Sequence, residues 1–194
     1  MGRGRHIIYF AKKGYDVIGN DYNSYMVELV KKDLRKNNLK ASLYNLDVTD
    51  LSEIKDNSFD YVICMYSSLG CIPGSENRQK AVNEFSRIVK KGGLVVIHAH
   101  NRLANIGYLQ YFGWTLKTYF WREKDLEVGD NYLGDHYLGG SYIHIFSHGE
   151  IKKIFRLSGL KITEEVYLNK NQNGYYSGWF NNLRSGGFIF VGQK

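Results

Sequence analysis

The chain has 194 residues, 43% of them apolar, which suits a single globular domain. No apolar run approaches the roughly 20 residues of a membrane-spanning helix, and the first residues lack the basic-then-apolar order of a signal peptide, so we expect a cytoplasmic protein without a membrane partner. The net charge of +7 allows a polyanionic partner, but the lysines and arginines are scattered, mostly in pairs, as on solvated helix faces. The two cysteines show no zinc spacing, so neither a metal site nor a disulfide is predicted.

The first 21 residues combine a glycine turn, a short amphipathic helix, an apolar strand and a carboxylate. Gly2 and Gly4 permit a tight turn and the close approach of a ligand, and the N-terminus of the following helix favours polar or anionic groups. Residues 15–20 are predicted to form a strand that ends at Asp21, where a carboxylate can accept both hydroxyls of a ribose. This order is half of a nucleotide-binding βαβ unit and suits a dinucleotide or an adenosine-type cofactor.

This stretch resembles the cofactor site of class I S-adenosylmethionine-dependent methyltransferases, whose first strand ends in an acidic residue and a Gly-x-Gly-x-Gly loop. Gly2 and Gly4 match the last two glycines, whereas the first glycine and the first strand have no counterpart. We therefore expect the coding region to begin upstream. The resemblance implies that Gly2, Gly4 and Arg5 line the methionine and ribose side of the cofactor, and that Asp21, with Tyr22 beside it, binds the ribose hydroxyls.

A second helix, capped by Asn23 or Ser24, is predicted from its apolar spacing, and residues 41–46 form the next strand. In the family, an acidic residue after this strand holds the adenine amino group and an apolar residue covers one ring face. Asp47 and Val48 match that pattern. The alternative is an aspartate that only caps a turn or a helix.

Residues 59–65 have the near-continuous apolar character of a buried parallel strand. The Phe-Asp-x-Val strand followed by Ser-Ser-Leu-Gly resembles the fourth strand and the substrate-facing loop of many bacterial methyltransferases. By this resemblance, Met65, Tyr66 and Ser67 form the floor of the cofactor site near the sulfonium, and Ser68 lies on the substrate side.

A helix that begins at Ser75 and stops at a Gly-Gly pair is followed by an apolar strand over 94–97. His98, His100, Asn101 and Arg102 come at the end of this strand. Ligands of open parallel sheets bind outside the carboxyl ends of the strands, so these side chains are candidates for the substrate side. Alternatively, the histidines find partners in a flanking helix.

Residues 103–146 lose their periodicity and become rich in Tyr, Trp, Gly and Asp. The resemblance implies a substrate lid, in which Trp121 is a candidate acceptor contact; the alternative is a segment that merely covers the sheet edge. A capping box, Ser147 to Glu150, then opens a helix. The strands 160–168 and 187–191 have no helix between them, so the final strand should run antiparallel.

The fold predicted by this resemblance is α/β: a Rossmann-like class I methyltransferase sheet with helices on both faces, an antiparallel C-terminal hairpin and its first strand missing, in one domain over 1–194. The predicted function is S-adenosylmethionine-dependent methyl transfer to a small-molecule acceptor, favoured because the aromatic residues gather in the insertion. His100 and His144 are candidate bases for acceptors that must lose a proton.

Three alternatives stay open. The segment 142–151 and the Arg-Ser-Gly-Gly-Phe sequence at 184–188 also resemble tRNA wobble-uridine methyltransferases. A glycine turn with Asp21 would equally hold NAD in an oxidoreductase. A catalytically inactive fragment or binding module is the third, because two strand edges would lack a partner without the first strand.

Overall fold

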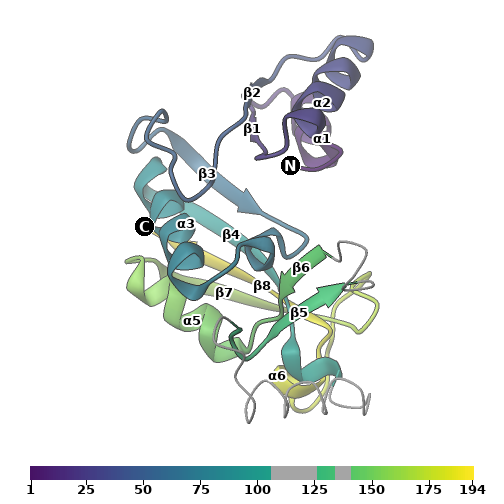
Figure 1. The fold of residues 1–194 in the computed structure, drawn as a ribbon, viewed down its shortest axis with the longest axis vertical. Helices are drawn as coiled ribbons and strands as arrows, with labels where there is room; N and C mark the ends of the chain where they lie inside the picture. Colours follow the sequence, from purple (N-terminus) through teal and green to yellow (C-terminus); the bar gives the residue numbers. More distant parts are fainter. Residues whose placement is uncertain (106–125, 134–140) are drawn as a thin grey trace. The chain divides into compact units, whose positions relative to one another are not determined.

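The computed structural model describes residues 1–105, 126–133 and 141–194. The chain divides into two compact units, 1–53 and 54–194, and each contains a sheet of its own. Figure 1 shows both units, the first in purple and blue at the start of the chain. Both units contain α/β elements that the sequence predicts, and the second also contains a hairpin and a short helix that it does not.

In the first unit, two short parallel strands are flanked by two helices. Asn23 caps the second helix, because its side chain accepts a hydrogen bond from the Tyr25 amide at 3.0 Å. The core of the unit consists of Ile7, Val30 and Leu34. The bounds are Arg5–Lys12 (α1), Ile18–Asn20 (β1), Ser24–Lys36 (α2) and Ser42–Tyr44 (β2).

The glycine turn has the backbone that the sequence predicts. Gly2 and Gly4 have φ values of 53° and 69°, in the left-handed region that favours glycine. A Cβ on Gly4 would lie 2.8 Å from Val30, so α1 packs against α2 only because this position has no side chain. A Cβ on Gly2 would meet no atom within 4 Å. The backbone at Gly2 is therefore open to a ligand.

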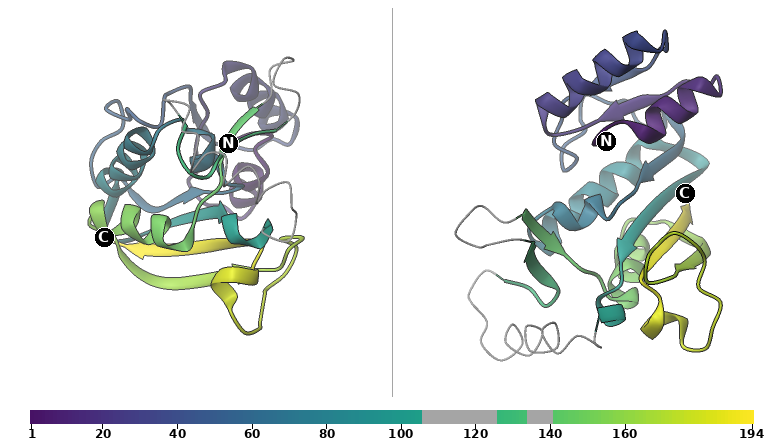
Figure 2. Two further views of the ribbon diagram at one scale, coloured as in Figure 1. Left: turned by 60° about the horizontal axis from the view of Figure 1, so that its bottom comes forward. Right: turned by 90° about the vertical axis from the view of Figure 1, so that its right-hand side faces the viewer.

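The second unit contains a four-stranded sheet in the order β3-β4-β8-β7. Strands β3 and β4 are parallel, whereas β8 runs antiparallel to both β4 and β7, as predicted for the final strand. Figure 2 shows β8, in yellow, between β4 and β7. The bounds are Phe59–Cys64 (β3), Val89–His100 (β4), Lys161–Leu168 (β7) and Gly187–Gln193 (β8).

Helices α3 (Ser75–Ile88) and α5 (His148–Leu157) contact each other and the sheet. The predicted capping box is present at the start of α5, since Ser147 and Glu150 bond each other's amides. Phe155 of α5 is fully buried, and its ring lies over Gly192, where a Cβ would come within 2.5 Å of it. A short helix, α6 (Asn181–Arg184), precedes β8.

The structure differs from the predicted elements in two main places, and β1 and β2 are also shorter than predicted. β4 begins at Val89, so the Gly-Gly pair lies inside the strand and Gly92 takes the left-handed φ of 79°. Within the insertion, Asp130–Leu133 (β5) and Ser141–His144 (β6) pair as an antiparallel hairpin that periodicity did not indicate. The other predictions for the insertion, including Trp121, fall outside the described residues.

No helix among the described residues is long and apolar enough to cross a membrane.

Candidate functional site

Of the predicted cofactor residues at the start of the chain, Gly2 contacts the carboxylate of Asp21 directly. Its Oδ2 accepts a hydrogen bond from the Gly2 amide at 2.8 Å and lies 3.0 Å from the amino group of Met1. Its Oδ1 accepts from the Asn23 amide at 3.0 Å. Burial opposes the charge, but these amides and the amino group outweigh it and lower the pKa of Asp21. Asp21 is therefore an anion at neutral pH, held at the C-terminal end of β1 beside the glycine turn.

Asp47 lies beyond the end of β2 and makes local contacts. Its Oδ1 accepts from the amide and the hydroxyl of Thr49, at 2.9 and 2.8 Å. This geometry is that of an aspartate that caps a turn, and direct contact of Asp47 with a cofactor stays a prediction. Nearby, the Asn45 amide group donates to the carbonyls of Asp21 and Tyr22, both at 2.8 Å, and so holds the ends of β1 and β2 together. Asn45 was not among the predicted residues.

The loop after β3 has an unusual backbone. Tyr66 and Ser67 have φ values of 56° and 54°, a left-handed conformation that non-glycine residues rarely adopt. Ser67 is completely buried, whereas the Tyr66 ring is 59% exposed. The Ser68 hydroxyl donates to the Met65 carbonyl at 2.7 Å and fixes the turn. Strain at this position of the loop fits a residue held for a ligand.

His98 and His100 lie at the C-terminal end of β4, beside this loop. Nδ1 of His98 accepts the Ser67 amide proton at 3.0 Å, and the Ser67 hydroxyl accepts from the His100 amide at 3.3 Å. The two imidazole rings meet edge to face at 5.3 Å. Burial lowers the pKa of His98 to about 4 and also lowers that of His100. Both rings are therefore neutral at pH 7.

Gln172, from the loop after β7, is a site residue that the sequence did not indicate. Its Nε2 lies 2.7 Å from Nδ1 of His100 and donates to the Gly186 carbonyl at 3.2 Å. Gln172 sits in a run of asparagine and lysine whose pattern is that of a plain polar loop.

Asn101 and Arg102, both predicted on the substrate side, make mainly structural contacts. The Asn101 side chain is buried and donates to the carbonyls of Asn182 and Ser185, at 3.0 and 2.8 Å, so it anchors α6. The Arg102 guanidinium bonds the Val128 carbonyl and lies 3.4 Å from Glu150. A direct contact with substrate stays a prediction for both.

His144, the second candidate base, belongs to a buried chain of charged groups. Its Nδ1 lies 2.6 Å from Asp130 and its Nε2 lies 3.5 Å from Glu150. Burial opposes charge on the imidazole, but the two carboxylates outweigh it and raise the pKa of His144. Burial also opposes the charge on Glu150, but its contacts with His144, the Ser147 amide and Arg102 outweigh burial and lower the pKa of Glu150 to about 2. With both nitrogens facing carboxylates, His144 is better placed to stabilise the fold than to accept a proton.

The same chain continues on the other side of Asp130. The Tyr142 hydroxyl donates to Asp130 at 2.6 Å and accepts from Arg78 at 3.2 Å. Arg78, buried on α3, pairs with Glu127. Glu127, Asp130 and His144 bring three potential metal ligands within 4.8 Å, but Arg78, Tyr142 and the imidazole proton already engage the carboxylates. The contacts favour an ion-pair network over a cation site.

The first half of the chain matches a known family, since the model of the methyltransferase domain covers residues 1–97. Among curated proteins, a glycine/sarcosine N-methyltransferase from Parasynechococcus marenigrum is 26% identical over 134 residues, which are 68% of this chain and 46% of that protein. A tRNA (uracil(54)-C(5))-methyltransferase from Pyrococcus horikoshii is 35% identical over 72 residues, 37% of this chain and 17% of that protein. The chain thus spans less than half the length of either relative.

Solved structures resemble the whole chain. A SAM-dependent methyltransferase from Methanosarcina mazei aligns with a TM-score of 0.80 and 23% identity over 100% of this chain and 88% of its own. A second, from Clostridium acetobutylicum, aligns with a TM-score of 0.69 and 14% identity over 99% of this chain and 80% of its own. At these identities the likeness shows the fold. Together with the family match, it means that the chain belongs to the methyltransferase domain family and has the class I fold of S-adenosylmethionine-dependent methyltransferases.

Proposed function

We propose that the chain transfers the methyl group of S-adenosylmethionine to a small-molecule acceptor. The observation that carries the proposal is the Asp21 carboxylate held 2.8 Å from the Gly2 amide at the end of β1, within the part of the chain that the family model covers. The donor set fits the cofactor, because an anionic carboxylate suits a ribose diol and the open Gly2 backbone allows close approach. Gly4, Arg5 and Tyr22 complete the ribose and methionine side of the proposed site.

Asp47 and Val48 would bind the adenine, and Met65, Tyr66 and Ser67 would face the methionine end. S-adenosylmethionine supplies a methyl group on a sulfonium, whose leaving group departs neutral, so the transfer needs little acid-base help. The protein's own part is to exclude water and to hold the acceptor in line with the methyl group, which accounts for most of the expected rate. His98 and His100 are the proposed acceptor-side groups. A cytoplasmic location stays a prediction.

Calorimetry with S-adenosylhomocysteine and with NADH tests the cofactor. We expect binding of S-adenosylhomocysteine and none of NADH at the same concentrations, because the site residues match the methyltransferase pattern. Preference for NADH would overturn the proposal in favour of an oxidoreductase. Binding of neither ligand would favour the inactive fragment or binding module.

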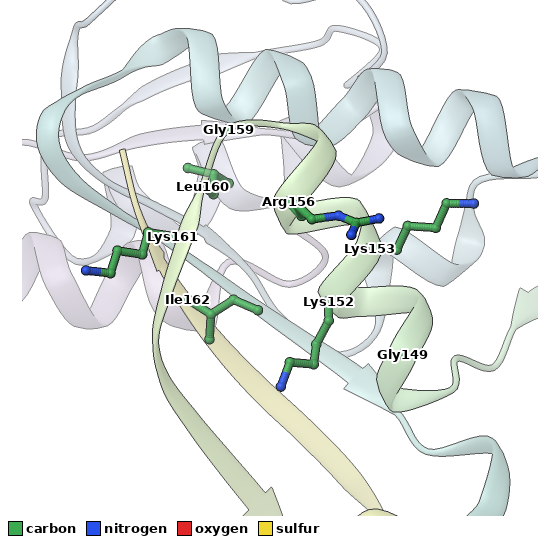
Figure 3. Close-up of a pocket in the computed structure, with 8 residues that line it drawn as sticks. All are labelled: Gly149, Lys152, Lys153, Arg156, Gly159, Leu160, Lys161 and Ile162. Carbon is green, nitrogen blue, oxygen red and sulfur yellow. The ribbon is translucent and has the colours of Figure 1, made fainter.

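The small-molecule acceptor is supported by the relative named for glycine and sarcosine, which covers more of the chain than the tRNA enzyme does. The alternative needs a surface for RNA, and the described residues offer a hollow of about 630 Å³ lined by basic side chains of α5 and β7. Figure 3 shows that these side chains diverge: Lys153 and Arg156 extend to one side and Lys161 to the other. Lys152 is paired with Glu165 at 2.8 Å. Divergent cations are typical of a solvated helix face.

Filter binding of bulk tRNA at two salt concentrations tests the acceptor class. We expect weak tRNA binding. Charge reversal at Lys152 and Lys153 on α5 should change it little, and no more than charge reversal at the control pair, Lys31 and Lys32 on α2. Phosphate contacts release counterions, so a true RNA site would bind tightly at low salt and weaken steeply as salt rises. Tight, salt-sensitive binding that only the α5 pair abolishes would reverse our preference.

A further inference from the structure

His98 and His100, at the end of β4, each have a neighbour whose hydrogen bond determines which ring nitrogen carries the proton. These neighbours are the Ser67 amide and the Gln172 side chain. A backbone amide can only donate, so the Ser67 N–H leaves Nδ1 of His98 as an acceptor without a proton. Since the neutral ring carries one hydrogen, that hydrogen is on Nε2 of His98.

Gln172 does the same for His100. Its amide orientation is determined by the Gly186 carbonyl, 3.2 Å from Nε2, because the opposite orientation would set two oxygen atoms against each other. Nε2 has two hydrogens, and the second is directed to Nδ1 of His100 at 2.7 Å. Gln172 therefore specifies the tautomer of His100, as the Ser67 amide specifies that of His98.

Gln172 has a strained backbone, and the surrounding residues fix the position of its side chain. Its φ of 53° lies in the left-handed region, which is strained for a residue with a side chain. Gly187 of β8 leaves the space it occupies, since a Cβ there would lie 3.2 Å from Nε2 of His98 and 3.4 Å from Cδ of Gln172. Strain of this kind persists only where the surrounding contacts over-determine it.

We propose that Gln172 is a positioning residue that locks His100 as the Nε2–H tautomer, so that His100 donates a hydrogen bond to the acceptor molecule. The hydrogen bonds of His100 in the described part of the chain involve its Nδ1 and its backbone amide, so Nε2 is the ring nitrogen that can face the acceptor molecule. His100 is then a donor and not the base suggested by its place in the sequence. The acceptor it suits carries an oxygen lone pair, as a carboxylate or carbonyl does. This assignment of substrate class rests on the proposed methyl transfer.

Long-range proton–nitrogen NMR of ¹⁵N-histidine-labelled protein tests the lock, with His98→Asn and His100→Asn variants to assign the two rings. In the unaltered protein near pH 7, we expect both rings as neutral Nε2–H tautomers. Gln172→Ala should leave His98 unchanged, because Ser67 still donates to it, and convert His100 to a mixture of tautomers. Asn171→Ala, in the same loop, is the matched control and should change neither ring.

Gln172→Glu gives the sharpest contrast. A carboxylate can only accept, so Nδ1 of His100 should become protonated and the His100 pKa should rise. An Nδ1–H signal for His100 in the unaltered protein, or a His100 spectrum that neither Gln172 variant alters, would overturn the proposal. The spectra need no cofactor, so failure to bind S-adenosylhomocysteine would count against the proposed function and leave the tautomer assignment standing.

Discussion

Asp130→Ala is expected to lower the free energy of unfolding by about 3–5 kcal/mol, the cost of removing one partner from a buried ion pair. The side chains of Asp130 and His144 are only 3% and 1% exposed. Asp130 accepts from the Tyr142 hydroxyl and the Glu127 amide as well as facing the imidazole. Its removal leaves these donors buried without an acceptor. Urea unfolding followed by circular dichroism measures the loss.

Asp60→Ala is the matched control. Asp60 pairs with Lys90 at 2.8 Å, but its side chain is 69% exposed, so its loss should cost less than about 1 kcal/mol. Equal losses for the two variants would mean that the buried chain contributes no more than a surface ion pair.

The loss of unfolding free energy in Asp130→Ala should also depend on pH. The pKa of His144 is raised in the folded state, so its share of stability is complete below about pH 6.5 and is lost as pH rises through the folded value. The pKa of Glu150 is lowered to about 2, so its share is present above about pH 4.5 and is lost as pH falls toward 2. Arg78 opposes the charge on His144 and Arg102 supports that on Glu150. The pKa of Asp130 is lowered as well, so its own share is present above about pH 3.8. The difference between the unaltered protein and Asp130→Ala should therefore be largest between about pH 3.8 and 6.5.

Asp21→Ala should weaken binding of S-adenosylmethionine by roughly 1.5–3 kcal/mol, or about 10- to 150-fold in Kd, the range for hydrogen bonds to a charged group. The carboxylate is expected to bind the ribose hydroxyls, and it also holds the Gly2 amide in the glycine turn. Calorimetry gives the change in Kd, and circular dichroism of each variant reports whether the fold is kept.

Asp16→Ala is the control for this measurement. Asp16 is exposed, lies in the same unit and precedes the same strand, so its removal should leave the affinity unchanged. An Asp21→Ala protein that folds and binds as tightly as the control would reassign Asp21 to a purely structural turn.

Local chemistry explains why much of the fold could be predicted. The Asn23 cap, the capping box at Ser147 and the left-handed glycines depend on residues a few positions apart, and a single sequence contains all of them. The antiparallel β8 followed from the absence of a helix long enough for a parallel crossover.

The features that were not predicted depend on contacts between residues far apart in the sequence. The hairpin of β5 and β6 places charged residues, Asp130 and His144, in buried positions, which inverts the apolar alternation that identifies a strand. Gln172 meets His100 across 72 positions of chain, and its neighbours have the composition of an ordinary loop. In both cases a distant partner determines the role of a residue.

The position of β8 bears on the order in which the second unit is assembled. β8 follows β7 and α6 in the chain, yet it pairs with β4 on one side and β7 on the other. During synthesis, β4 and β7 therefore lack their shared neighbour until Gly187–Gln193 has been made, and both present open backbone edges until then. Closing the sheet joins segments far apart in sequence, which slows folding and prolongs that exposure. Nascent chains of this protein are consequently most prone to aggregate just before β8 is added.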